Sequence, residues 1–292
     1  MAGSDRVWMN GELVNAGEAR VPVDDLGFTA GFAIFETFLW RDQHFYFFEQ
    51  HLARMRTGAE SLTIPWPPPW SLQDALAAYG AELGAQPRAV RAMLTRGRPD
   101  SHPNLIIAAR PVTQYPADGV ELRIHPEPLR LDAFGSGATQ GSIKSTNRVF
   151  YTLAREAAQQ AGAWDALYLT PTGQLAETSI ANLFVVIDGA VRTPALACGC
   201  LAGVMRETAL LALRSDRVEN VSSVGEVEAT LDRSVLAAAS EVFLTNSTGR
   251  VIPVRAVQGI KDFAAPGPIT RAVDAAIQQL EAEDRAGARS GA

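Results

Sequence analysis

Short apolar runs separated by turn residues dominate the first fifty residues. Residues 7–9 and 12–14 are two such runs on either side of Asn10-Gly11, and an Asn-Gly pair readily takes the positive φ angles of a type I′ turn. Two aromatic-rich runs follow at 34–40 and 44–47, with a short polar connection between them. Because aromatic and β-branched residues favour strands, both pairs of runs predict β-hairpins in one N-terminal sheet.

Helical periodicity follows these runs. Over residues 49–62 the apolar side chains recur at intervals of three and four, which predicts an amphipathic helix with one buried face. A second helix is expected over 71–83, because Ser71 is a good N-terminal cap. Strands are expected at 89–95 and 105–109. The first part of the chain therefore predicts a mixture of strand and helix.

The second half of the chain shows the same alternation of patterns. Asn147 is a suitable cap for a helix that runs to about Ala161. The residues expected on its buried face are Val149, Leu153, Ala157 and Ala161. The apolar pattern and the turn residues also predict strands at 166–170, 174–176 and 181–187, a helix from about Val204, and a strand-turn-strand unit at 241–254.

Two changes in composition divide the chain. Segments 111–119 and 132–141 are rich in Pro, Gly and polar residues, which is typical of connections between compact regions. We place the domain boundary in the first segment and interpret the second as a mobile connection beside the functional site. The expected α/β (α+β) protein has a small N-terminal α/β domain at 1–115, a larger C-terminal domain at 120–285 and a disordered tail at 286–292.

Composition restricts the class of protein. The 292 residues suffice for two domains with separate cores. With 47% apolar and 20% charged residues the chain has the composition of a soluble globular protein, and a net charge of −6 gives no electrostatic reason to expect nucleic acid or an acidic membrane as partner. No apolar run is long enough to span a bilayer and no signal-peptide pattern is present, so we expect a cytoplasmic protein. Cys198 and Cys200 are expected as buried or loop thiols, without a metal site.

Candidate chemistry centres on one lysine and one carboxylate. Lys144 follows a Gly/Ser-rich approach to the helix at 147–161, and Glu177 stands where a strand ends among hydroxyl-bearing residues. Pyridoxal phosphate (PLP) chemistry needs an amine that forms a Schiff base and an acid group that keeps the pyridine nitrogen protonated. Each residue also has an ordinary alternative, since a single lysine before a helix is usually solvent-exposed and a glutamate in a turn usually caps a helix or forms an ion pair.

Further segments could bind an anion. The Gly-containing stretch at 198–203 leads into the helix near Val204, and such a junction directs unpaired N–H groups and the positive end of a helix dipole toward a phosphate. Ser247 and Thr248, in the turn of the last strand pair, could donate to the same phosphate. The loop at 96–103 is either a solvated hairpin tip or the carrier of an anion-binding arginine.

Five stretches occur in an order typical of one known family: 25–37, 51–54, 144–147, 177–184 and 201–206. From Asp24 to Pro253 the chain resembles the fold type IV PLP enzymes, which include branched-chain aminotransferases, D-amino acid aminotransferases and 4-amino-4-deoxychorismate lyase. The resemblance implies a smaller N-terminal α/β domain and a larger C-terminal domain with a barrel-like sheet. It also implies PLP bound between these domains in a homodimer, with small-molecule amines as substrates and partner loops that help to close the site.

The resemblance implies roles for individual residues. Lys144 is expected to form the Schiff base and to move the substrate proton, and Glu177 is expected to pair with the pyridinium nitrogen. Arg148 is expected to reach the cofactor's ring hydroxyl or the substrate carboxylate. The groups expected to bind the cofactor phosphate are the Arg54 side chain, the backbone N–H groups of Val204 and Met205, and the Ser247 hydroxyl.

The reaction is predicted from differences within the family. Phe35 stands where D-amino acid aminotransferases typically carry a tyrosine, and the loop with Arg96 and Arg98 lacks their Arg-x-His pair. Arg148 replaces a tyrosine of the branched-chain enzymes, whereas residues 144–148 are similar to aminodeoxychorismate lyases. We therefore expect a lyase that gives 4-aminobenzoate and pyruvate in folate biosynthesis, with these three arginines as candidates for binding substrate carboxylates.

Two alternatives to the lyase stay open. The first is a class IV transaminase that acts on D-amino acids, (R)-amines or branched-chain amino acids with a keto-acid acceptor, because the same proton transfer serves both reactions. The second is a relative without PLP that only binds or supports other molecules. A yellow purified protein would exclude the second alternative.

Overall fold

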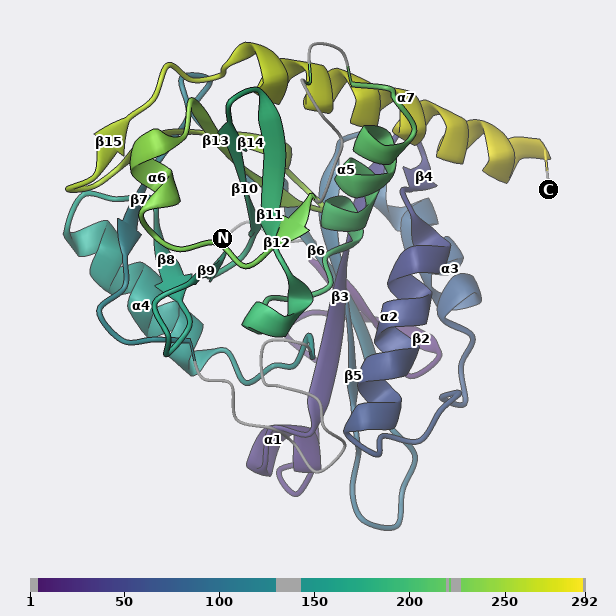
Figure 1. Ribbon diagram of the computed structural model, residues 1–292. Helices are drawn as coiled ribbons and strands as arrows, with labels where there is room; N and C mark the ends of the chain where they lie inside the picture. Colours follow the sequence, from purple (N-terminus) through teal and green to yellow (C-terminus); the bar gives the residue numbers. More distant parts are fainter. Residues whose placement is uncertain (1–4, 130–142, 219–220, 222–226, 291–292) are drawn as a thin grey trace. The chain divides into compact units, whose positions relative to one another are not determined.

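The structure is a computed structural model that describes residues 5–129, 143–218, 221 and 227–290 (Figure 1). It divides into two compact units. Unit 1 comprises Met1–Thr113 with Ile143–Arg148, and unit 2 comprises Gln114–Ser142 with Val149–Ala292. The segment 132–141, which was expected to be a mobile connection, lies outside the described residues.

Unit 1 is built on an antiparallel six-stranded sheet with the order β2-β1-β6-β5-β3-β4. Both predicted hairpins are present. Asn10 and Gly11 take φ angles of 51° and 102° in the first turn, and β3 pairs with β4 in the second. The strands are β1 Arg6–Met9, β2 Glu12–Asn15, β3 Ala33–Arg41, β4 His44–Phe45, β5 Arg88–Thr95 and β6 Leu105–Pro111.

The helices of unit 1 are α1 Leu26–Thr29, α2 Phe48–Ser61 and α3 Leu72–Leu83. The Ser71 hydroxyl accepts a hydrogen bond from the Asp74 N–H at 3.2 Å, which confirms the predicted cap. Helix α2 packs against β3, as Figure 1 shows, and α3 packs on β1 and β6. Because side chains alternate along a strand, Ile34, Glu36 and Phe38 of β3 share one face and are all buried.

Unit 2 contains a closed barrel of six strands. The strands follow the order β10-β13-β14-β7-β8-β9, and β9 pairs again with β10 through Glu177 and Asn182, which closes the ring. The expected barrel-like sheet is therefore confirmed. The ring consists of β7 Val120–Ile124, β8 Asp165–Leu169, β9 Leu175–Thr178, β10 Asn182–Ile187, β13 Glu241–Asn246 and β14 Arg250–Val257. Strands β11 Ala190–Pro194, β12 Glu228–Ala229 and β15 Lys261–Asp262 extend the sheet beside it.

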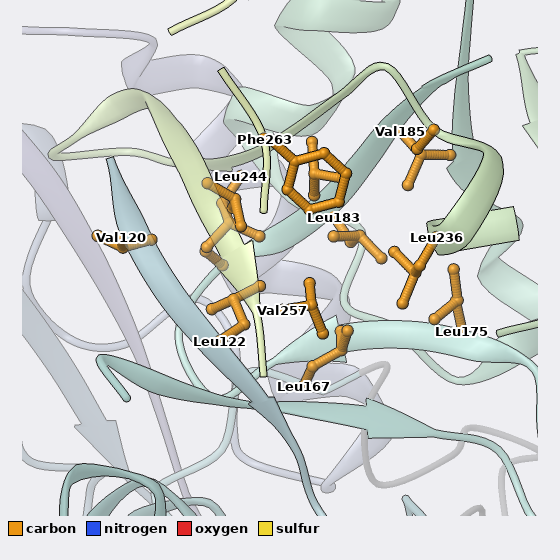
Figure 2. Close-up of a cluster of buried hydrophobic side chains, with 14 of the residues drawn as sticks. Val120, Leu122, Leu167, Leu175, Leu183, Val185, Leu236, Leu244, Val257 and Phe263 are labelled. Atoms are coloured by element: carbon orange, nitrogen blue, oxygen red, sulfur yellow. The ribbon is translucent and has the colours of Figure 1, made fainter. Parts of the chain in front are cut away.

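Aliphatic side chains from every strand of the ring form a common core (Figure 2). Val120 and Leu122 lie two positions apart on β7 and share one face, as do Leu183 and Val185 on β10. All four are at most 1% exposed. A core packed in this way fixes the strand ends, and Glu177 stands near one of them on β9.

Helices α5 and α7 pack against each other and against β13, and α7 also contacts β14 (Figure 1). Helix α5 begins at Val204, as the sequence predicts. The helical segments of unit 2 are α4 Val149–Gln160, the 3₁₀ helix η2 Leu196–Cys198, α5 Val204–Arg214, α6 Val235–Ala238 and α7 Pro268–Ser290. In the described part of the chain, no helix is both long and apolar enough to cross a membrane.

The buried face of α4 differs from the predicted one. Val149 and Leu153, which were expected to be buried, are 72% and 59% exposed. The Tyr151 ring lies instead on Tyr168 of β8, with 5.3 Å between the ring centroids. Apolar residues occur on more than one side of this helix, so the packing of the aromatic ring determined which side faces the strand. The buried residues of α4 are Tyr151, Ala154 and Ala158.

The C-terminal helix α7, which was not predicted, reaches into the segment expected to be a disordered tail. Helix α7 continues to Ser290, so residues 286–290, which were assigned to a disordered tail, are helical. The alanine and arginine residues in this segment favour helix, and they continue a helix whose earlier turns are already packed.

Candidate active site

Strand β3 fixes the backbone of Lys144. The Phe35 N–H donates to the Lys144 carbonyl at 2.9 Å, and the Thr146 N–H donates to the Ala33 carbonyl at 2.9 Å. A further isolated bridge joins Ile34 to Ser145. Lys144 is half-buried, and its Nζ lies 4.7 Å from the centroid of the Phe35 ring. The segment before α4 is therefore held like an extra strand, and the lysine side chain lies beside Phe35.

The next residue of β3 is the centre of a buried charged cluster. Glu36 is 0% exposed and accepts two hydrogen bonds from Arg54, from Nε to Oε1 at 2.8 Å and from Nη2 to Oε2 at 2.6 Å. His51 Nδ1 lies 2.7 Å from Oε2 of the same carboxylate. Burial alone would raise the pKa of Glu36, but Arg54 and His51 lower it to about 2. Glu36 is therefore ionised at neutral pH.

His51 completes this cluster as a neutral donor. Burial lowers the pKa of His51, and the neighbouring Glu36 charge opposes this shift only in part. Since the ionised Glu36 carboxylate can only accept, the proton of the neutral ring resides on Nδ1. The ring is also packed on Phe38, with 4.7 Å between the centroids.

Sequence reasoning included Glu36 and His51 in family-like stretches but gave them no role. A signal was present for each. Glu36 is a single acid in the apolar run 34–40, and an acid in a buried strand requires a cationic partner. His51 and Arg54 are three residues apart on α2, so both side chains reach the same face of the helix.

Arg91 is a further residue that the sequence did not single out. It lies on β5 opposite Thr37, and its guanidinium carbon is 3.8 Å from the centroid of the Phe35 ring. Loss of surrounding water lowers the pKa of Arg91, and the charges of Arg148 and Arg110 lower it further. Arg91 and Lys144 thus both lie against the Phe35 ring, and the charges of Arg148 and Arg110 act on Arg91.

The arginines of the loop at 96–103 have partners of their own. Arg96 lies 5.2 Å from the centroid of the Phe32 ring, and its backbone N–H donates to the Phe32 carbonyl at 2.8 Å. Arg98 forms an exposed ion pair with Asp24, at 2.8 Å between Nε and Oδ2. The structure therefore associates this loop with residues 24–32 of unit 1.

In unit 2, Glu177 is held by a loop and a neighbouring strand. It is buried, and its Oε2 accepts hydrogen bonds from the Leu201 N–H at 2.9 Å and from Asn182 Nδ2 at 3.2 Å. The same Asn182 nitrogen donates to the Leu201 carbonyl at 2.8 Å. Asn182 thus joins the carboxylate of β9 to the loop that precedes α5.

The start of α5 lies directly after this loop. Gly203 is its N-cap and provides no side-chain hydrogen bond, so the first N–H groups of the helix depend on other acceptors. Val204 and Met205, the first two residues of the helix, are buried. A Cβ atom at position 203 would overlap Oδ1 of Asn182. Glycine is therefore required for the close approach of this helix start to Asn182.

The turn that contains Ser247 joins β13 to β14. Oδ1 of Asn246 accepts hydrogen bonds from the N–H groups of Thr248 at 3.2 Å and Gly249 at 2.7 Å, and its Nδ2 donates to the Tyr115 hydroxyl at 3.1 Å. Ser247 is half-buried within this turn. Asn246 therefore fixes the turn through the hydrogen bonds of its side chain.

The cysteines are buried free thiols, as expected. Burial, reinforced by the Glu177 charge, raises the pKa of Cys200 to about 12, so this thiol is protonated at neutral pH. Among the described residues, no group of three or more His, Cys, Asp or Glu side chains is arranged to hold a metal ion.

Each unit thus contains part of the predicted residue set. Lys144, Phe35, Arg54, Arg148, Arg96 and Arg98 belong to unit 1. Glu177, Val204, Met205 and Ser247 belong to unit 2.

Known proteins resemble this chain over most of its length. The family described as amino-transferase class IV matches residues 33–257. A D-alanine aminotransferase of Bacillus licheniformis is 26% identical over 288 residues, which cover 94% of this chain and 96% of that protein. A putative branched-chain-amino-acid aminotransferase of Methanocaldococcus jannaschii is 24% identical over 265 residues, which cover 87% of this chain and 88% of that protein.

A solved structure extends the likeness to the fold. The PLP-bound form of a hypothetical aminotransferase from Mycobacterium tuberculosis has a TM-score of 0.81 to this chain at 21% identity, covering 96% of this chain and 99% of that chain. The fold type IV architecture expected from the sequence is thereby confirmed. Since the family match covers most of the chain, this protein belongs to the class IV aminotransferases, which are PLP-dependent enzymes.

Proposed function

We propose that this protein is a transaminase that moves an amino group between an amino acid and a keto acid. The observation that carries the proposal is the fixed backbone of Lys144, which is hydrogen-bonded to β3 beside Phe35. An amine tethered to a rigid strand reacts at high effective concentration, which PLP chemistry requires. The aminotransferase relatives support transfer rather than the lyase reaction that the sequence suggested.

We assign the reaction steps to two residues. Lys144 would hold PLP, and its side-chain amine would move the proton at the amine-bearing carbon of the substrate. Bound PLP supplies the electron sink that makes this proton acidic. Glu177 would keep the pyridine nitrogen of bound PLP protonated, because a nearby carboxylate stabilises the charged form. The buried position of Glu177 and its hydrogen bonds to Leu201 and Asn182 support this role.

The phosphate of PLP is assigned to donors whose surroundings suit an anion. The Arg54 guanidinium carries a permanent positive charge and can donate charge-assisted hydrogen bonds to a phosphate. Helix α5 starts without a side-chain cap, so its first N–H groups can donate to a phosphate. The proposed donors are Arg54, the backbone of Val204 and Met205, and the Ser247 hydroxyl.

A carboxylated substrate is favoured by the cations around Phe35. The Arg91 guanidinium stacks on the ring that Lys144 also contacts, and the Arg148 charge is close enough to lower the pKa of Arg91. A carboxylate would relieve this repulsion between like charges. Of the two loop candidates from the sequence, Arg98 already forms an ion pair with Asp24 and is therefore less suited to the substrate than Arg91. Arg96, which lies over the Phe32 ring, stays a candidate.

The lyase is kept as the second candidate function because of the same cations. Two cations against the Phe35 ring, with the Arg148 charge acting on one of them, also suit a flat dicarboxylate such as aminodeoxychorismate, whose products would be 4-aminobenzoate and pyruvate. A role in folate biosynthesis depends on this candidate alone.

One set of assays separates the two functions. PLP-loaded protein is given D-alanine or L-alanine with 2-oxoglutarate, and L-leucine or (R)-1-phenylethylamine with 2-oxoglutarate or pyruvate. A separate tube holds aminodeoxychorismate without an acceptor. The proposal expects acceptor-dependent formation of a new amino acid and none with Lys144→Ala. If pyruvate and 4-aminobenzoate form in equal amounts without an acceptor and no amino group is transferred, the transaminase proposal is wrong and the lyase is supported.

The oligomeric state and the cellular location are also proposals, the first from the family resemblance and the second from the sequence. We expect a homodimer, and size-exclusion chromatography with light scattering tests this expectation. A cytoplasmic location is likewise proposed from the sequence, and fractionation of the source cells tests it.

A further inference from the structure

The buried cluster on β3 and α2 contains two residues to which the proposed function gives no task. Glu36 and His51 are 0% and 1% exposed, and they contact each other and, through Glu36, the Arg54 guanidinium. Arg54 itself is less deeply buried, with 13% of its side chain exposed. The cluster therefore connects an ionised carboxylate in the core with a guanidinium that is partly accessible at the surface.

The hydrogen-bond geometry restricts Arg54 more than a single contact would. Its Nε and Nη2 atoms each donate to a different oxygen of Glu36, at 2.8 Å and 2.6 Å. Two parallel hydrogen bonds fix both the position and the plane of a guanidinium. His51 donates to Oε2 from Nδ1, and its ring is packed on Phe38, so the carboxylate is in turn prevented from rotating.

We propose that Glu36 and His51 are positioning residues that hold the Arg54 guanidinium in the orientation that binds the cofactor phosphate. This inference rests on the proposed role of Arg54. The direction in which Glu36→Gln changes the affinity for PLP tests the inference, because Glu36 is an anion beside the proposed site for another anion. If charge alone mattered, Glu36→Gln would strengthen PLP binding by removing a negative charge. If orientation matters, the same change weakens PLP binding.

The measurement compares PLP with pyridoxal, which has the same aldehyde and ring but no phosphate. Full-length protein freed of cofactor is titrated with each compound. The affinity for PLP divided by the affinity for pyridoxal is the ratio that reports on the phosphate contact alone. Glu36→Gln is expected to lower this ratio at least tenfold, and Arg54→Met at least as much. General damage to the fold would instead weaken the binding of both compounds alike and leave the ratio unchanged.

Matched variants keep the test independent of folding. Asp25 is another fully buried carboxylate of unit 1, hydrogen-bonded to Gly27, Thr95 and Asn104, and Asp25→Asn is expected to leave the ratio unchanged. His51→Asn retains a donor close to the position of Nδ1 and should keep the ratio near the wild-type value. His51→Leu has no donor and should lower the ratio several-fold, so this pair carries the test if Glu36→Gln does not fold.

The outcomes distinguish the inference from the function on which it rests. If Arg54→Met lowers the ratio but Glu36→Gln leaves it unchanged or raises it, the positioning role is wrong and the phosphate role of Arg54 stands. If Arg54→Met leaves the ratio unchanged, the phosphate assignment fails and the inference fails with it. A decrease for Arg54→Met, Glu36→Gln and His51→Leu, with none for His51→Asn, supports both.

Discussion

The carbonyl of Lys144 accepts a hydrogen bond from the N–H of Phe35 at 2.9 Å, and the Lys144 side-chain nitrogen lies 4.7 Å from the centroid of the Phe35 ring. The hydrogen bond fixes the main chain at Lys144 without involving the side chain to which the proposed function assigns the chemistry. Substitutions of the lysine can therefore change the chemistry while the backbone bridge to β3 persists.

Lys144→Ala is expected to abolish the visible absorbance that lysine-bound PLP gives to the protein, because Lys261 is the only other lysine in the sequence. Lys261→Ala is a suitable control, since this lysine donates to the carbonyls of Ala237 and Ala239 in unit 2. Spectra are recorded after addition of PLP, with circular dichroism to verify the fold. A Lys144→Ala protein with the wild-type spectrum would contradict the assignment.

Acid should destabilise the protein through the Glu36 cluster. The pKa of Glu36 falls from 4.5 to about 2 on folding. The resulting stabilisation is present above pH 4.5, is lost as the pH falls toward 2, and amounts to on the order of 3 kcal/mol at about 1.4 kcal/mol per pKa unit. The lowered pKa of His51 adds a loss of stability below pH 6.5.

Urea unfolding of the wild type and of Glu36→Gln between pH 7 and pH 3 tests this linkage. The variant should be less stable at pH 7 but should lose less stability below pH 4.5. Glu60→Gln changes an exposed carboxylate that is paired with Arg56 on α2. In this control the free energy of unfolding should fall with decreasing pH as steeply as in the wild type. If the free energy of unfolding depends on pH equally in the wild type and in Glu36→Gln, then Glu36 is not the cause of the loss of stability in acid.

Gly203→Ala is expected to disturb the loop that holds Glu177. The new Cβ atom would overlap Oδ1 of Asn182, whose Nδ2 contacts both Glu177 and Leu201. We expect a loss of about 1–3 kcal/mol of stability and faster release of PLP during dialysis. Gly17→Ala is the control, because no atom lies within 4 Å of a Cβ at that position. Equal PLP retention in the two variants would argue against a role for this close approach.

Arg91→Gln should change the choice of substrate. Alanine and isopropylamine differ in that the carboxylate is replaced by a methyl group, so their kcat/KM values compare substrates with and without a carboxylate. We expect the variant to lose about ten- to a hundredfold in kcat/KM for the reactive enantiomer of alanine, as for one charge-assisted contact, and little for isopropylamine. Arg88→Gln is the control, since Arg88 lies on the same strand at a position of opposite parity. Equal losses for both amines would contradict carboxylate binding by Arg91.

Local features of the sequence determined much of the fold. The Asn10-Gly11 pair produced the first hairpin because its φ angles are set locally, and Ser71 capped α3 because the cap bonds a residue only three positions away. The family-like stretches were also local, and the family that they indicated matches residues 33–257. Signals of this kind are complete within a few residues, so no knowledge of distant packing was needed.

Tertiary structure decided the rest. The face of α4 was mispredicted because both sides of the helix are partly apolar, and only the contact of Tyr151 with Tyr168 selects one of them. The stacking of Arg91 on Phe35 depends on the register between two strands that are more than fifty residues apart in the chain. The link from Glu36 to Arg54 likewise requires α2 to lie on β3. Such pairings depend on which surfaces meet, and a local pattern in the sequence does not contain that information.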